Sequence, residues 1–121
     1  MPAAPGPTIQ LFGLADSRPT QAALRFFKER RVNVTNVDLR RRPIAVGELR
    51  RFVERLGAAA LLDTESKRYK DLGLSYMRLG DDEIVERLLA DNSLLRLPLV
   101  RLGNAFTAGP AEATWKAWLG K

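Results

Sequence analysis

Residues 8–27 constrain the fold more than any other part of the chain. Their apolar segment, residues 9–12, suits a buried strand, and a short loop follows it. Pro19 then favours the first turn of a helix, because its φ is fixed and its missing N–H is not needed there. Asp16 and Ser17 are both common N-cap residues. We therefore expect a strand, a loop and a helix, with backbone N–H groups and the positive end of the helix dipole meeting near Ser17.

The chain contains neither cysteine nor histidine. Thioredoxin-fold proteins place a reactive cysteine at such a helix end, because the helix stabilises a thiolate there. In this chain the residue at that point is Ser17. Disulfides, thiol redox cycling and thiolate metal sites are therefore excluded, and the commonest general base is missing. Any catalysis must use carboxylates, lysine, arginine, tyrosine or hydroxyl groups.

The remaining pattern predicts strands and helices in a definite order. A βαβ unit with a parallel strand pair comes first, then a helical stretch, a β-hairpin and a terminal helix. The expected helices are 19–31, 45–56, 81–90 and 111–119, and the further strands are 32–39, 97–102 and 105–107. This is the order of a thioredoxin-like α/β fold, with a mixed four-stranded sheet, a helical insertion between its halves and a C-terminal helix.

Hydrophobic spacing also predicts which side chains form the core. Val46 begins the apolar face of the helix 45–56, and Leu72 ties a polar segment to the core together with Tyr69. Trp115 and Trp118 lie three positions apart in the last helix. We expect both tryptophans, with Leu119, in the core, where a ligand cage is the alternative.

The length of 121 residues predicts a single domain over residues 8–121. Residues 1–7 are rich in proline, alanine and glycine, without the basic and apolar regions of a signal peptide, so they are expected to form a flexible tail. No apolar run is long enough for a membrane helix. The default expectation is a cytoplasmic protein that does not engage a membrane.

Four segments resemble the arsenate reductase (ArsC) and Spx family. They are LFGLADS at 11–17, VDLR at 37–40, ALL at 60–62 with YKDL at 69–72, and NSLLRLPLV at 92–100. The resemblance implies a thioredoxin fold over almost the whole chain. It also places the nucleophilic cysteine of the reductases at Ser17 and the second cysteine of Spx-type regulators at Thr20.

The same resemblance makes Pro98 a cis-proline that faces the active site. The arginine that usually precedes this proline is Leu97 here, and Arg96 is its neighbour. Arg96 could therefore bind an anion beside Pro98, or it could be an ordinary surface residue. Ser17 has two roles open to it, as an N-cap or as a donor to a bound thiolate or oxyanion, for example glutathione.

A net charge of +6 makes an anionic partner conceivable. The basic candidates are Arg40, Arg41, Arg42, Arg50 and Arg51, which form either a solvated surface or a patch for an acidic protein or nucleic acid. No aromatic residue interleaves with them in the sequence, which disfavours single-strand binding. The acidic residues 81–83 are expected to start a helix rather than bind a metal.

Arsenate reduction requires an attacking thiolate, so we do not expect the family's reductase activity. We expect a redox-inactive binding or regulatory module without metal or cofactor. Spx-type relatives bind RNA polymerase, so the resemblance implies a partner in transcription. The alternative is a protein or enzyme that binds glutathione or an oxyanion through Ser17.

Overall fold

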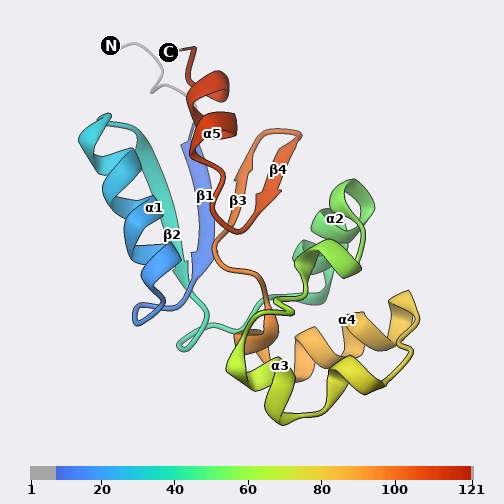
Figure 1. Ribbon diagram of the computed structural model, residues 1–121. Coiled ribbons are helices and arrows are strands. Elements are labelled where there is room, and N and C mark those ends of the chain that lie inside the picture. The colour runs from blue at the N-terminus through green and yellow to red at the C-terminus, as the bar shows by residue number, and fades with distance from the viewer. Residues whose placement is uncertain (1–7, 121) are drawn as a thin grey trace.

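One four-stranded sheet runs through the computed structural model, which describes residues 8–120 (Figure 1). The expected tail at residues 1–7 lies outside the described residues. The strands are β1 (Thr8–Gly13), β2 (Asn33–Asp38), β3 (Leu99–Leu102) and β4 (Ala105–Ala108). The helices are α1 (Arg18–Glu29), α2 (Val46–Leu56), α3 (Lys67–Asp71), α4 (Asp81–Ala90) and α5 (Glu112–Trp118). Short 3-10 turns lie at Ala59–Leu61, Leu74–Tyr76 and Asn92–Leu94.

The strand order is β2-β1-β3-β4. β1 runs parallel to β2, with Thr8 opposite Asn33, because α1 crosses over between them. β3 is antiparallel to both β1 and β4, and Phe12 lies opposite Leu99. This mixed sheet confirms the predicted thioredoxin-like fold, with its βαβ unit and its C-terminal hairpin.

The face of the sheet that α1 and α5 cover has an aromatic core. Trp115 contacts both Phe26 and Phe27, with ring centroids 5.5 and 5.1 Å away. Its indole N–H donates to Thr107 Oγ1 at 2.8 Å, so the one polar atom of this buried ring is satisfied. Trp115 is therefore a core residue as predicted, whereas Trp118 and Leu119 are only partly buried.

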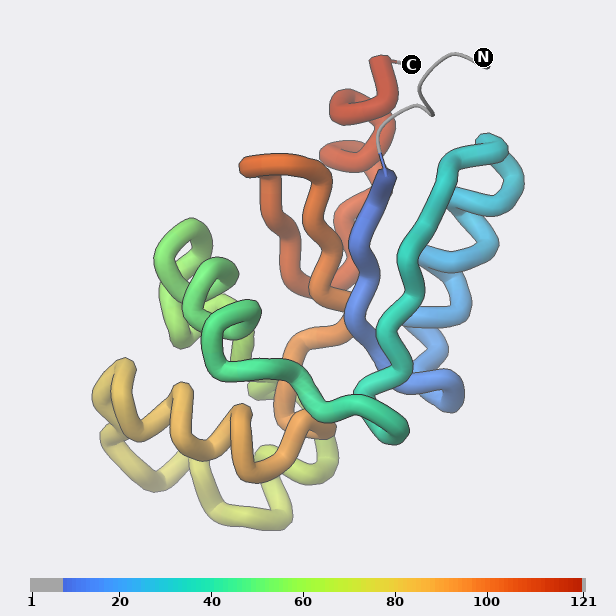
Figure 2. Tube along the Cα trace, turned by 180° about the vertical axis from the view of Figure 1, so that it is seen from behind, coloured from blue at the N-terminus to red at the C-terminus, as the bar shows by residue number. Residues whose placement is uncertain are grey.

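The opposite face carries the helical insertion and a core made mainly of leucine. At its base, Asn92 Oδ1 accepts the Ile44 N–H at 2.9 Å, and Asn92 Nδ2 donates to the Leu88 carbonyl at 2.8 Å. One side chain therefore joins the chain where the insertion begins and where it ends. In Figure 2 the insertion lies beside the β3–β4 hairpin, away from β2.

Two predictions about this core are wrong. Val46 is 49% exposed, because it starts α2 one turn before Leu49, the first residue of the helix to reach the core. Leu72 is 38% exposed, because α3 ends there, and Leu74 is buried in its place. Tyr69 does pack against the core as predicted. Within residues 8–120, none of the helices is both long and apolar enough to span a membrane.

Candidate functional site

The loop that leaves the carboxyl end of β1 leads directly to the N-terminus of α1. Ser17 Oγ accepts the backbone N–H of Thr20 at 3.3 Å, which makes Ser17 the N-cap of the helix. The prediction of a cap at Asp16 or Ser17 is thus confirmed for Ser17, and Pro19 lies in the first turn as expected. The hydroxyl of Ser17 therefore already serves a structural purpose.

Thr20 lies beneath this loop and is only 2% exposed. Its hydroxyl has no hydrogen-bond partner among the residues that the structure describes. A Cβ on Gly13 would lie 2.5 Å from Thr20 Cγ2, so glycine is required where β1 crosses this side chain. Thr20 also lines a hollow of about 140 Å³ that Asn36 and Asp38 border.

Pro98 lies at the same end of the sheet. It precedes Leu99, which pairs with Phe12, so it is beside the end of β1 from which the loop to Ser17 departs. The Leu97–Pro98 peptide bond is cis, as the resemblance implies. The Pro98 carbonyl accepts the Gly109 N–H at 3.0 Å, which holds the segment before β3 against the segment after β4.

Arg96 and Leu97 differ in what they can offer to a ligand. Leu97 is 8% exposed and belongs to the leucine-rich core, so a core residue precedes Pro98. Arg96 is exposed, and its backbone N–H donates to the Leu61 carbonyl at 2.8 Å. The Arg96 side chain crosses Gly109, where a Cβ would lie 2.8 Å from both Cγ and Cδ. This contact fixes the direction of the side chain beside the Pro98 segment.

An ion pair that the sequence reasoning missed lies next to Ser17. Arg40 Nη2 lies 3.0 Å from Asp16 Oδ2, and both side chains are exposed. The hydrogen bond and the charge of Arg40 lower the pKa of Asp16, and Asp16 in turn raises the pKa of Arg40. Because β1 and β2 are parallel, the loops that follow their carboxyl ends lie at the same end of the sheet. The predicted parallel arrangement of the two strands could therefore have indicated that Asp16 and Arg40 lie close together.

The predicted basic residues do not share one surface. Arg40 is bound to Asp16, and Arg42 lines a hollow beside β2. Arg51 lines a different hollow beside β4, whereas Arg41 and Arg50 are exposed. The candidates therefore divide among several parts of the surface.

An aromatic ring, Phe106, lies among arginines beside β4. The guanidinium groups of Arg101 and Arg55 lie 5.3 and 6.0 Å from the centroid of the Phe106 ring. Arg101 also forms an ion pair with Glu48 at 2.9 Å. Arg101 and Phe106 pair within the hairpin, whereas Arg55 comes from α2, far away in the sequence, so spacing alone could not place Arg55 in this cluster.

Comparison with solved structures agrees with the fold. The YFFB protein superimposes with a TM-score of 0.84 at 21% identity, over 90% of this chain and 96% of that one. An ArsC family related protein from Bacteroides fragilis gives 0.80 at 20% identity, over 90% and 95%. The arsenate reductase from Vibrio cholerae gives 0.76 at 17% identity, over 89% and 94%. At these identities the likeness concerns the fold alone.

Sequence comparison gives the family. No curated protein sequence matches the chain significantly. A family model described as the ArsC family matches residues 17–118, which is most of the chain. The match begins at Ser17 and includes Thr20, Arg96 and Pro98. The chain therefore belongs to the ArsC family.

Proposed function

We propose that the chain is a redox-inactive member of the ArsC family that acts as a binding or regulatory module. The observation that carries this proposal is the residue at the start of α1. Ser17 takes the place of the family's cysteine, and its oxygen accepts the Thr20 N–H. Neither cysteine nor histidine occurs elsewhere in the sequence to replace the missing thiol or to supply a base.

The local electrostatics also argue against a serine nucleophile. A serine hydroxyl is protonated at neutral pH and needs an adjacent base to become reactive. The neighbouring carboxylate, Asp16, is bound by Arg40, which lowers its pKa. A carboxylate with a lowered pKa is a weaker base than an ordinary one. Without a cysteine, the chain also has no thiol of its own that could take part in a sulfur redox cycle with arsenate.

A second candidate function is the binding of glutathione or an oxyanion at this end of the sheet. Arg96 favours it, because Gly109 holds the stem of this exposed arginine beside the Pro98 segment. The N-terminus of α1 would add backbone N–H groups and a positive dipole. In this second role the Ser17 hydroxyl would donate a hydrogen bond to the bound anion. For the leading candidate, the partner implied by the Spx resemblance is a component of the transcription machinery.

The first experiment is a titration of the 15N-labelled protein with glutathione and with arsenate, followed by amide chemical shifts. The binding-module proposal expects no saturable shifts at millimolar concentrations and no arsenate reduction with glutathione and glutaredoxin. Saturable shifts at Ser17, Arg96 and Leu97 would favour the second candidate instead. Measurable reductase turnover by the purified chain would overturn the redox-inactive proposal.

A matched pair of variants separates a ligand role from a structural one. Ser17→Ala and Ser66→Ala each remove an N-cap oxygen, since Ser66 Oγ accepts the Tyr69 N–H at the start of α3. If Ser17 binds a ligand, only Ser17→Ala weakens the binding. If Ser17 is an N-cap alone, both substitutions lower stability by about 1 kcal/mol and neither changes a ligand titration.

A further inference from the structure

The outer edge of β2 is open. β2 pairs with β1 over its full length, from Asn33 to Asp38. Within residues 8–120, no other strand pairs with its far side. Proteins usually block such an edge with proline, a bulge or a charged side chain. Residues 33–37 contain neither proline nor a charged residue, and the charged residue of β2, Asp38, is the last of the strand, so the edge from Asn33 to Val37 can accept a further strand.

The register shows which backbone groups face outward. The Leu39 N–H donates to the Gly13 carbonyl of β1. In a parallel pair, alternate residues of a strand bond to the same neighbour. Val37 and Thr35 therefore also bond to β1, whereas Val34 and Asn36 direct their N–H and C=O groups away from the sheet. These are the groups that an added strand would use.

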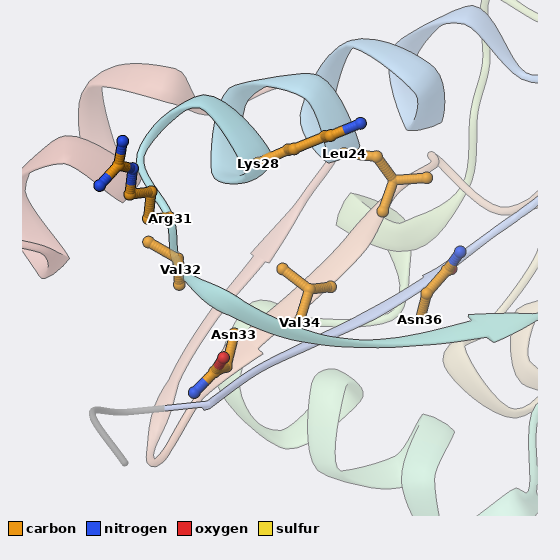
Figure 3. A pocket seen from close by; sticks show the side chains of 7 residues that line it. All are labelled: Leu24, Lys28, Arg31, Val32, Asn33, Val34 and Asn36. Carbon is orange, nitrogen blue, oxygen red and sulfur yellow. The ribbon is translucent and has the colours of Figure 1, made fainter.

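Hollows flank this edge on both faces of the sheet. On the α1 side a hollow of about 500 Å³ lies between Leu24 and Lys28 of the helix and Val34 and Asn36 of β2 (Figure 3). On the α2 side a hollow of about 180 Å³ is bordered by residues of the opposite alternation, Thr35 and Val37, and by Arg42. A strand points successive side chains to opposite faces. A segment paired with β2 would therefore place alternate side chains beside one hollow and then the other.

The side chains that border these hollows are mainly positively charged, which favours an acidic partner. Lys28 and Arg31 line the larger one, and Arg42 lines the smaller one. Among the residues that the structure describes, the only acidic one in either lining is Glu48, which Arg101 already binds. A second copy of the chain would bring the same cations together, and its net charge of +6 opposes that approach. An acidic segment of another protein is complementary.

We infer that the outer edge of β2 binds an extended acidic peptide segment of a partner protein as a fifth strand. Backbone hydrogen bonds to Val34 and Asn36 would supply the pairing. Apolar side chains would lie against Leu24 and Val34, and carboxylates would face Lys28, Arg31 and Arg42. This inference goes beyond the proposed function and does not depend on any ligand at Ser17.

The test uses a blocked octapeptide with the sequence Glu-Glu-Val-Val-Glu-Glu-Val-Val, added to the 15N-labelled protein. Pairs of each residue place both carboxylates and apolar side chains on each face of an extended peptide. We expect saturable shifts at β2 and slower hydrogen exchange of the Val34 and Asn36 amides. The same octapeptide with lysine in place of each glutamate is the matched control and should not bind. Affinity for the glutamate peptide should fall as salt is added, because the guiding charges are exposed.

Two pairs of variants locate the binding. Val34→Pro removes an outward N–H without removing a bond to β1, and Val34→Ala keeps that N–H. We expect Val34→Pro to weaken peptide binding about tenfold relative to Val34→Ala, a ratio typical of losing a backbone hydrogen bond. Lys28→Glu should weaken binding by a similar factor. Lys70→Glu makes the same charge change at an exposed residue of α3 that borders neither hollow, and it should leave binding unchanged. Ser17→Ala should leave peptide binding unchanged.

Four results would overturn the inference. They are no binding of the glutamate peptide, equal binding of both peptides, unchanged affinity of Val34→Pro, and dimerisation of the protein through β2. Because none of these readouts involves glutathione, arsenate or Ser17, failure here leaves the proposed function standing. Equally, detection of reductase turnover would leave the peptide result unaffected.

Discussion

The two edge strands of the sheet, β4 and β2, differ in what surrounds them. At one edge β4 is four residues long, and its Phe106 packs against Phe52 of α2 with ring centroids 4.9 Å apart. Arg55 and Arg101 lie over the same ring. At the other edge β2 is six residues long, and the hollows beside it are bordered by Lys28, Arg31 and Arg42.

The helical insertion accounts for this difference. It follows β2 in the chain, but α2 lies beside the hairpin in both views of the molecule (Figures 1 and 2). The insertion therefore packs against β4, the edge strand from the later half of the chain, whereas β2 has no strand on its outer side within residues 8–120. Covering an edge is one way in which proteins avoid unwanted strand pairing. An edge left open in the same molecule is available for a chosen partner.

The largest expected effect concerns the covered edge. Phe52→Ala removes a fully buried ring that contacts both Phe12 and Phe106, and it should lower the free energy of unfolding by about 3–5 kcal/mol. Urea denaturation measures this loss, and hydrogen exchange should quicken at β4 but not at β2. Val46→Ala in the same helix is the control, with an expected change within about 0.5 kcal/mol. A loss below 1 kcal/mol for Phe52→Ala would show that α2 does not hold β4 in place.

A second prediction compares the inner and outer sides of β2. Thr35→Pro removes an N–H that bonds to β1 and leaves a β1 carbonyl without its donor, which should cost about 2–3 kcal/mol. Val34→Pro affects an outward N–H and should cost less than about 1 kcal/mol. Thermal or urea unfolding of the two variants gives the comparison. Equal losses would contradict the assignment of Val34 to the open side.

A third prediction tests the ion pair between Arg101 and Glu48 beside β4. The side chains of Arg101 and Glu48 are 19% and 22% exposed, so their ion pair is largely shielded from water. Glu48→Gln should lower stability by about 1 kcal/mol, because a charged hydrogen bond becomes a neutral one. A double-mutant cycle with Arg101→Met isolates the pair energy. A coupling energy near zero would mean that the packing of Phe106 alone covers this edge.

The smallest effect is expected at the exposed pair that follows β1 and β2. Arg40→Ala should raise the pKa of Asp16 towards its ordinary value, because it removes both the hydrogen bond and the positive charge. The lowered pKa means that the pair stabilises the fold above the ordinary carboxylate pKa, and that this stabilisation is lost as pH falls through the lowered value. NMR titration of the Asp16 carboxyl measures the shift. An unchanged pKa would show that the two loops are not in contact in solution.

The local pattern of the sequence predicted most of the fold. Pro19 and Ser17 mark the start of α1, and β-branched residues mark β2, because both signals depend on neighbouring residues. Val46 and Leu72 were misplaced, because burial at the end of a helix depends on what the rest of the chain places beside it. The same limit applies to the candidate site.

The candidate site was predicted only in part for that reason. Ser17 and Pro98 follow from local motifs. The contacts of Arg40 with Asp16 and of Arg96 with Gly109 join residues far apart in the sequence, so spacing alone could not give them. The open edge of β2 likewise became visible only once the strand order was known.

The hydrogen bonds of Asn92 have an evolutionary consequence. One of them links Asn92 to Ile44, 48 positions earlier, so the insertion leaves the sheet and returns to it at one point. A segment closed at its base in this way can gain or lose residues without displacing the strands on either side. Changes in chain length during evolution should therefore disturb the stability of the fold least when the insertions and deletions fall within this segment. Substitution of Asn92 itself should be tolerated far less well than the replacement of whole turns beyond it.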